Sequence, residues 1–456
     1  ATWNALLDLA EKYYPLYQFQ FFWRNFVIIR HPDDVKILLS CKDNITKGNL
    51  AYDNMRHLGL DGVIMSGGQK WATRRKMLNP AFSQAIMKIY AALDEDHADR
   101  FIEELRSGDQ VQIRSIFPMF HQYSLGISFE AILGLDVHDV APKDRDRFAD
   151  AVKSLTDISF FRAARPFLAN WMMPFLSEGR KQYRLTKWAK EWMSEILTER
   201  RKSMRNEVLL RYQDSFEDTD TLLHGTKGKK KMAVIDLLLE AQEKNAIDES
   251  GVHEELLIFL SGGYESTGVF LSFMLLIFAE NKQIQDRARS EVLAVTNEGG
   301  GKMTESGIQK LDYLERCLQE VLRIYPSIPL IGRTLDTDLN LKNYVVPAGT
   351  EVFIHLVALH RDPNFWPDPL RFDPDRFLPG AVHERHPFAY SPFSAGLRNC
   401  IGRKFAMLGA KMAISKVLQN FYIEQVDPRD KMEFKFTLPL QPIEPMHVKF
   451  IRIDQN

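Results

Sequence analysis

Apolar residues recur every three to four positions over most of the chain, which is the period of an amphipathic helix. This spacing predicts helices over residues 1–14, 32–39, much of 83–205, 252–279, 311–325 and 405–421. Alternation with a period of two is confined to short runs, and it predicts strands over residues 16–22, 26–30, 339–346, 351–356 and at the C-terminal end. The pattern therefore predicts many helices and a few short strands.

The composition is that of a globular protein with enough apolar residues for a large core. Of the 456 residues, 45% are hydrophobic and 26% are charged. The 59 basic and 60 acidic residues give a formal charge of -1, so no overall positive field would attract nucleic acid. Three scattered cysteines form no disulfide framework, which favours a reducing compartment such as the cytosol.

The apolar runs are shorter than the roughly 20 residues that span a bilayer. The longest of them, 269–279, has about half that length. The sequence begins at Ala1 without a methionine or a leader. We therefore expect an N-terminal membrane anchor to be absent from this sequence, and the part given to be soluble or peripheral.

The segment before the last long helix is rich in glycine and carries a single cysteine. Because free N–H groups at a helix start favour a thiolate, Cys400 suits a metal ligand. Gly396 and Gly402 permit tight turns and the close approach of a flat cofactor, while Phe393 can shield the sulfur and Arg398 can meet a carboxylate. One cysteine is too few for structural zinc but sufficient for a haem. A lone cysteine is more often a buried structural thiol, but here five residues stand at set offsets.

Trp71 and Arg75 stand four positions apart in a segment with helical spacing, so they share one face of the helix. Their indole N–H and guanidinium could then hold one carboxylate together. The alternative is an amphipathic helix with a tryptophan in the core and a solvated basic face.

The helix expected over 252–279 carries two glycines and several hydroxyl side chains near its middle. Gly262 and Gly263 each cost a helix about 1 kcal/mol relative to alanine, so we expect the helix to bend or open there. Glu265 beside Ser266 places an acid next to an alcohol, a pair that can relay protons. The alternative is a packing seam, where small residues let another helix approach.

Three further features carry little information by themselves. Glu320 and Arg323 stand three positions apart on an expected helix, a spacing that is common for exposed ion pairs. His355 and His360 have no second ligand at metal spacing, so we interpret them as packing and turn residues. An aromatic and methionine cluster over residues 160–175 is either core packing or an apolar surface at a substrate entrance or membrane.

Taken in order, these segments resemble the motifs of the cytochrome P450 family. The chain has the W-x-x-x-R helix, the glycine-acid-alcohol helix, E-x-x-R, a proline-rich segment with Asp375 and Arg376, and the cysteine loop. The resemblance is greatest to the animal clan that contains fatty-acid omega-hydroxylases and insect detoxification and lipid enzymes. It implies a mainly α fold, the cytochrome P450 fold, in which residues 1–456 form one helical catalytic domain with small β-sheets around a buried haem.

The resemblance also implies a role for each motif residue. The proximal iron ligand would be Cys400, in a loop with Phe393, Gly396 and Gly402. The haem propionates would lie against Trp71, Arg75, Arg333 and Arg398. Protons would pass through Glu265, Ser266 and Thr267. A buried charge network would join Glu320, Arg323 and Arg376. The substrate would contact Ile64, Gly262, Leu330 and Ile331, below a roof formed by the cluster over 160–175.

Three positions depart from the family pattern. Ser266 stands where the family usually has threonine, so we expect activity with poorer coupling of electrons to product. Asp375 replaces the usual glutamate. Gly262 stands where many members of this clan carry a glutamate that esterifies the haem. We therefore expect non-covalent haem b, and terminal-carbon hydroxylation is less strongly indicated.

The activity that the resemblance implies is insertion of one oxygen atom from O2 into a hydrophobic substrate, whether a fatty acid, another lipid or a xenobiotic. Electrons would come from NADPH through NADPH-cytochrome P450 reductase, with cytochrome b5 as a second donor, at the cytosolic face of the endoplasmic reticulum membrane. A basic docking patch would comprise Arg74, Lys76, Arg403 and Lys404, although solvated charges are the simpler interpretation. The competing hypotheses are a haem-thiolate isomerase or dehydratase, and a non-enzymatic haem carrier or gas sensor.

Overall fold

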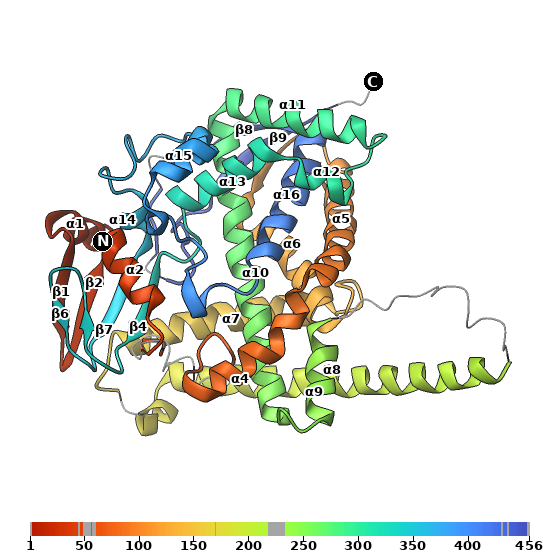
Figure 1. Ribbon diagram of the computed structural model, residues 1–456. Helices are drawn as coiled ribbons and strands as arrows, with labels where there is room; N and C mark the ends of the chain where they lie inside the picture. The colour runs from red at the N-terminus through yellow and green to blue at the C-terminus, as the bar shows by residue number, and fades with distance from the viewer. Residues whose placement is uncertain are drawn as a thin grey trace.

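Helix α10, Glu249–Glu280, runs through the middle of the protein (Figure 1). Its second half is apolar on every side, and residues 268–278 are all buried, as expected of a helix that other elements surround. Among the described residues it is also the one helix long and apolar enough to cross a bilayer, and 67% of that apolar window is buried inside the protein. This helix therefore forms the centre of the core.

The structure is a computed structural model that describes residues 2–43, 46–48, 56, 61–168, 170–217, 233–429, 432–435 and 437–453. Most of them are helical, which confirms the expected mainly α fold. Besides α10 the helices are α1 Thr2–Lys12, α2 Pro32–Ser40, α4 Gly68–Leu78, α5 Gln84–Arg106, α6 Ile116–Ser128, α7 Pro142–Ala163, α8 Ser177–Glu217, α9 Val234–Glu243, α11 Lys282–Glu298, α12 Glu305–Gln309, α13 Asp312–Ile324, α14 Leu356–His360, α15 Pro379–Glu384 and α16 Arg403–Asn420.

The strands form three small sheets. Their bounds are β1 Leu16–Phe21, β2 Arg24–Ile29, β3 Val111–Ser115, β4 Leu330–Thr334, β5 Leu339–Asn340, β6 Val345–Val346, β7 Glu351–His355, β8 Phe421–Gln425 and β9 His447–Arg452. The largest sheet has the order β1-β2-β7-β4, in which β2 and β7 are parallel and the other neighbours are antiparallel. In Figure 1 this sheet lies at one side of the molecule, away from the helices α5 and α16.

Helix α6 crosses α10 at close range because α10 carries glycine at the crossing. A Cβ on Gly268 would lie 2.8 Å from the imidazole of His121 on α6, so no larger residue fits without movement. Ser124, also on α6, donates a hydrogen bond of 2.7 Å to the carbonyl of Tyr264. The packing-seam interpretation of the small residues therefore applies at this end of the glycine-rich stretch.

Three expected elements differ from those observed. The expected strand over 339–346 is instead the two-residue strands β5 and β6, because Leu341 and Tyr344 close a tight turn between them. Helix α8 continues to Glu217, twelve residues beyond the expected end. The helix expected over 405–421 begins two residues earlier, and Phe421 already belongs to β8.

Candidate active site

A cavity of about 400 Å³ lies beside the middle of α10 and has mostly apolar walls. One wall is the glycine-rich stretch of α10, from Ser261 to Thr267, and another is the loop around Cys400 with the start of α16. Residues from α4, α6 and α7 close the remaining sides. The structure thus brings the sequence-predicted cysteine and the acid–alcohol pair to one enclosed space.

The cysteine loop owes its shape to one glycine in particular. Gly396 has φ +67, and a Cβ there would lie 2.0 Å from the carbonyl oxygen of Leu39. The amide N–H of Cys400 donates a 2.9 Å hydrogen bond to the carbonyl of Phe393 and closes the loop. The expectation that Gly402 permits a forbidden turn is wrong, since its φ of -86 suits any residue. Gly402 instead lines the cavity, so its lack of a side chain leaves room beside the sulfur.

The sulfur of Cys400 faces the cavity, which accounts for its exposed surface. Burial raises the pKa of the Cys400 thiol above its usual value, although the N–H of Gly402 and the charges of Arg75, Lys47 and Arg403 lower it in part. The helix start thus acts in the expected direction, toward the thiolate, and burial of the sulfur opposes it. Loss of contact with water raises the pKa of the thiol by more than the helix N-terminus lowers it. A bound metal cation would stabilise the thiolate.

Positive side chains surround the sulfur. Arg75 donates hydrogen bonds to the backbone and side-chain oxygens of Asn399, at 2.9 and 2.7 Å. Arg398 lies over the ring of Trp71, 4.8 Å from its centroid, and donates to backbone carbonyls at Val63 and Ser66. Trp71, Arg75 and Arg398 all line the cavity.

Lys47 belongs to the same positive group and was missed from the sequence. It lines the cavity, and burial together with the charges of Arg333 and Arg398 lowers its pKa well below the usual value. A single lysine in a loop has no periodic neighbours, so the sequence offered no signal for it. Arg333 is buried and does not itself line the cavity, but its charge acts on Lys47, and its expected role at a propionate stays a prediction.

The acid–alcohol pair lies on an uninterrupted helix, so the expected local opening of α10 is not observed, while the expected bend stays a prediction. The hydroxyl of Ser266 donates a 2.7 Å hydrogen bond to the carbonyl of Gly262, one turn earlier, and the carbonyl of Ser266 accepts 3.0 Å from Ser327. Burial, with a contribution from the charge of Asp157, raises the pKa of Glu265 to about 8. A pKa near 8 favours the protonated form of this carboxyl at neutral pH.

The expected substrate contacts are partly corrected. Ile64, Gly262 and Ile331 line the cavity, whereas Leu330 does not. Neighbouring residues of a strand point to opposite sides, and β4 turns only Ile331 inward. The described residues of the cluster over 160–175 do not line the cavity either. The roof consists of earlier residues of α7, among them Phe148, Val152 and Leu155, whose helical spacing was visible in the sequence.

Comparison with known proteins gives the family of the chain. The family model for Cytochrome P450 matches residues 2–450. The chain belongs to the cytochrome P450 family. It is 31% identical over 433 residues to Cytochrome P450 4V2 of Mus musculus, which is 93% of this chain and 80% of that protein. Probable cytochrome P450 4ac2 of Drosophila melanogaster is 31% identical over 428 residues, with the same coverage of each chain. The chain is therefore a cytochrome P450 monooxygenase with a haem cofactor.

The residues of this cytochrome P450 fit a haem, which presents a flat apolar ring, two carboxylates and an iron. The apolar side chains of Phe393, Phe405 and Ala406 line the cavity beside the sulfur of Cys400. Lys47, Arg75 and Arg398 line the same cavity, and cationic side chains of this kind bind carboxylates, so this positive group matches the two carboxylates. The residues that line this cavity therefore fit the haem of the cytochrome P450 family in both chemistry and position.

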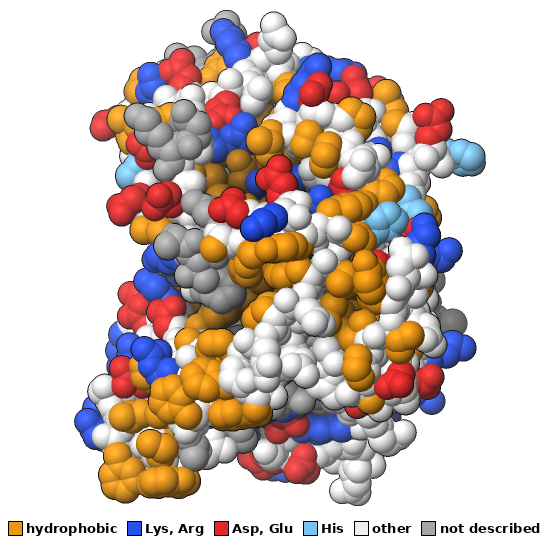
Figure 2. All heavy atoms as spheres, turned by 90° about the vertical axis from the view of Figure 1, so that its left-hand side faces the viewer, with side chains coloured by type: hydrophobic (Ala, Val, Ile, Leu, Met, Phe, Trp, Pro, Cys, Tyr) orange, Lys and Arg blue, Asp and Glu red, His pale blue; other side chains and the backbone are white. Residues whose placement is uncertain are grey.

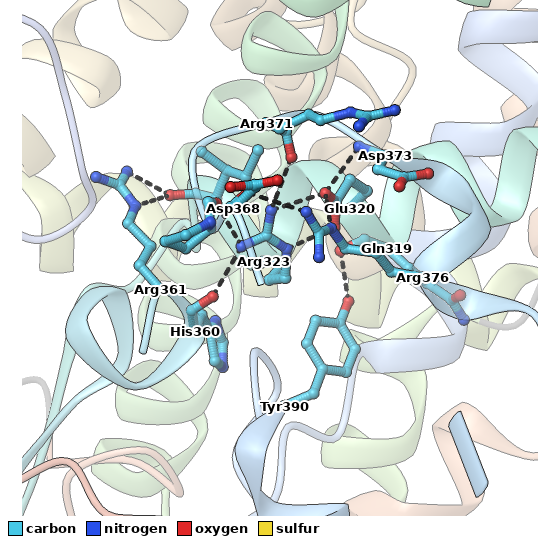
Figure 3. Close-up of polar contacts among 12 residues, drawn as sticks. Gln319, Glu320, Arg323, His360, Arg361, Asp368, Arg371, Asp373, Arg376 and Tyr390 are labelled. Carbon is cyan, nitrogen blue, oxygen red and sulfur yellow. Dashed lines mark hydrogen bonds and ion pairs between the residues drawn. The ribbon is translucent and has the colours of Figure 1, made fainter. Parts of the chain in front are cut away.

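The segment before the cysteine loop of this cytochrome P450 is held by a buried charge network (Figure 3). Arg323 donates to both carboxylate oxygens of Glu320, at 2.6 and 2.7 Å, and both residues are fully buried. Arg323 also donates to the carbonyls of His360 and Pro369, and Arg376 lies 3.4 Å from Glu320. These contacts link α13 to the meander that follows α14, so the network rigidifies the approach to Cys400.

Two other expectations can now be placed. Arg74 is buried and lies 3.6 Å from Glu255, so it is not part of an exposed docking patch, whereas Lys76, Arg403 and Lys404 are exposed. The histidines are fully buried: His355 accepts a hydrogen bond from the N–H of Ala358, and His360 accepts one from Ser391. No group of three metal-binding side chains occurs within the part of the chain that the structure describes.

Proposed function

We propose that this cytochrome P450 hydroxylates an apolar lipid-like substrate with electrons from NADPH-cytochrome P450 reductase. The observation that carries this proposal is the placement of the Cys400 sulfur and the Glu265–Ser266 pair on the walls of one apolar cavity. An isomerase or a carrier would not need a protonated acid aimed into that cavity. The haem, bound as non-covalent haem b, would activate O2 and supply the oxygen atom that enters the substrate.

The chain itself would bind, orient and supply protons. Cys400 would hold the iron, and Arg75, Arg398 and Lys47 would hold the propionates together with Trp71. Arg333 would support this group from behind, since its charge acts on Lys47. Glu265 would keep a proton available near neutral pH because burial disfavours its charged form. Ser266 would pass protons only when its hydroxyl leaves the carbonyl of Gly262.

The walls favour an apolar substrate. Around α10 the cavity is lined by Ile64, Phe148, Val152, Leu155, Phe270 and Ile331. The described cations of the cavity lie on the side of Cys400, so the opposite part suits a neutral hydrocarbon chain or ring. Fatty acids, other lipids and xenobiotics all contain such groups.

We further propose that the enzyme works at the endoplasmic reticulum membrane, with cytochrome b5 as a second electron donor. Large apolar side chains are exposed at Phe22, Trp23, Phe167, Trp171 and Phe175, and the rings of Phe22 and Phe167 are 5.9 Å apart. Figure 2 shows hydrophobic side chains gathered at the lower end of one face. Exposed aromatic side chains gathered on one surface are typical of membrane or protein contact.

The carbon monoxide difference spectrum of the reduced protein tests the haem ligand. A strongly red-shifted Soret band that is lost in Cys400→His, but kept in Cys41→Ser, would support ligation by Cys400. An ordinary histidine-like band in well-folded native protein would contradict it. Formation of hydroxylated product with reductase, across a panel of lipids, then tests the activity itself.

Docking of the reductase is tested by charge reversal. We expect Lys76→Glu together with Lys404→Glu to raise the apparent Michaelis constant for reductase several-fold, because both side chains are exposed and positive. The haem spectrum should not change. An unaltered Michaelis constant would remove these residues from the docking surface.

A further inference from the structure

A second, much smaller cavity lies behind α10. It leaves about 10 Å³ for the centre of a water molecule, which is about the room that one molecule needs. Its walls come from α5, α6, α10 and α16, and they include Asp94, Tyr123 and Gly409. Four residues line both this small cavity and the large one: Ser128, Thr267, Phe405 and Ala406. The two spaces are therefore separated by single side chains, one of which is the hydroxyl-bearing Thr267.

Asp94 is an unusual group to find in such a place. It is completely buried, and neither of its carboxyl oxygens has a hydrogen-bond partner among the described residues. The hydroxyl of Tyr123, on the facing helix, is also buried and without a partner there. Buried polar groups are nearly always hydrogen-bonded, to protein or to an ordered water. Three polar atoms around one small cavity therefore point to a bound water.

The surroundings keep Asp94 neutral. Burial raises its pKa well above the usual value. The titratable groups on which a charge at Asp94 would act are Tyr90 and Tyr123, and both are phenols whose pKa is raised above its usual value. Lys416 on α16 is paired outward with Glu95 and Asp99. A neutral carboxyl keeps its O–H and acts as a hydrogen-bond donor.

The close contact at Gly409 shows that the carboxyl points into this space. A Cβ on Gly409 would lie 3.2 Å from both carboxyl oxygens of Asp94, and Gly409 itself lines the cavity. Alanine at this position would take the room of the water and crowd the carboxyl. The glycine on α16 thus keeps the small cavity open.

We propose that the small cavity binds one water molecule, which Asp94 and Tyr123 hold and which orients the hydroxyl of Thr267. Asp94 donates its O–H to the water, and the water donates to the Thr267 oxygen. The O–H of Thr267 is then free to donate into the large cavity. Asp94 is in this sense a positioning residue that acts through the water. The water site stands by itself, whereas the role of Thr267 rests on the function proposed above.

Infrared spectroscopy of the purified protein tests the water site without turnover. We expect a carboxylic acid band that disappears in Asp94→Asn and whose frequency is that of a hydrogen-bonded acid. In Gly409→Ala the same band should move to the higher frequency of an acid without a partner. Absence of an Asp94 band, or a band that Gly409→Ala leaves in place, would overturn the proposal. Gly380→Ala is the control, since nothing lies within 4 Å of its added carbon.

Coupling measurements test the role of the water toward Thr267. In Gly409→Ala and Asp94→Leu we expect the hydrogen peroxide released per NADPH to rise at least twofold, with haem content and the carbon monoxide spectrum unchanged. Asp94→Asn should release no more hydrogen peroxide per NADPH than the native protein, because its amide can still donate to the water. If the role of Asp94 were purely structural, all three variants would lose stability, and Asp94→Asn would release as much hydrogen peroxide per NADPH as Asp94→Leu.

The failures of the two proposals can be told apart. If the enzyme proves not to be a monooxygenase, the infrared band and its response to Gly409→Ala remain measurable and decide the water site. If the band behaves as expected but coupling is equal in Asp94→Leu and Asp94→Asn, the water is present but does not orient Thr267.

Discussion

Glu265 makes the stability of the protein depend on pH, because its carboxyl must lose water contacts when the chain folds. A pKa that rises from 4.5 to about 8 disfavours the ionised form in the folded state by about 5 kcal/mol. Because the pKa of Glu265 is higher in the folded than in the unfolded chain, burial of this group does not destabilise the folded state below pH 4.5. The free energy of unfolding then falls as the pH rises from 4.5 to about 8. Between pH 5 and pH 9 the loss amounts to about 4 kcal/mol.

The variant Glu265→Gln cannot ionise, so we expect it to avoid this loss. Its free energy of unfolding relative to the native protein should rise by about 4 kcal/mol between pH 5 and pH 9. Urea titrations of the haem-loaded protein at both pH values, followed by circular dichroism, measure this difference. Glu243→Gln, at an exposed position on α9, controls for effects of removing a surface charge.

One outcome would refute this reasoning about Glu265. If the stability difference between Glu265→Gln and the native protein is the same at pH 5 and pH 9, the carboxyl does not titrate in this range. Its environment would then be more polar than the burial in the structure implies, and its place as the proton donor of the cavity would also be lost.

Three further predictions concern the rest of the site. Gly396→Ala should lose haem and at least about 2 kcal/mol of stability, because its Cβ would clash with the Leu39 carbonyl. Haem content and thermal unfolding, compared with Gly380→Ala, measure the two losses. Retention of both haem and stability would contradict the predicted strain. Glu320→Ala should cost about 3–5 kcal/mol in unfolding titrations because it leaves a buried arginine without its carboxylate, and a loss under about 1 kcal/mol would show that water compensates. Ser266→Thr should consume fewer electrons per product because the added methyl restricts its rotamers; an unchanged ratio would show that serine couples equally well.

The cysteine loop shows how much the sequence can predict when residue type and spacing act together. Phe393, Gly396 and Cys400 were identified from their offsets, and the structure places Phe393 and Cys400 at the cavity, with Gly396 shaping the loop between them. Lys47 and Arg74 show the limit of such prediction. A charge has no period, so only the fold decides whether a basic side chain faces a cavity, an acidic partner or solvent.

The sequence by itself determined the elements and the chemistry available to them. The helical period, the strand alternation and the motif spacings depend on neighbours along the chain, and they predicted α10, α13 and α16 to within a few residues. Tertiary structure alone decided which groups lose contact with water. The raised pKa values of Glu265 and Asp94 and the inward turn of Ile331 rather than Leu330 all follow from the packing of distant segments, which no local pattern encodes.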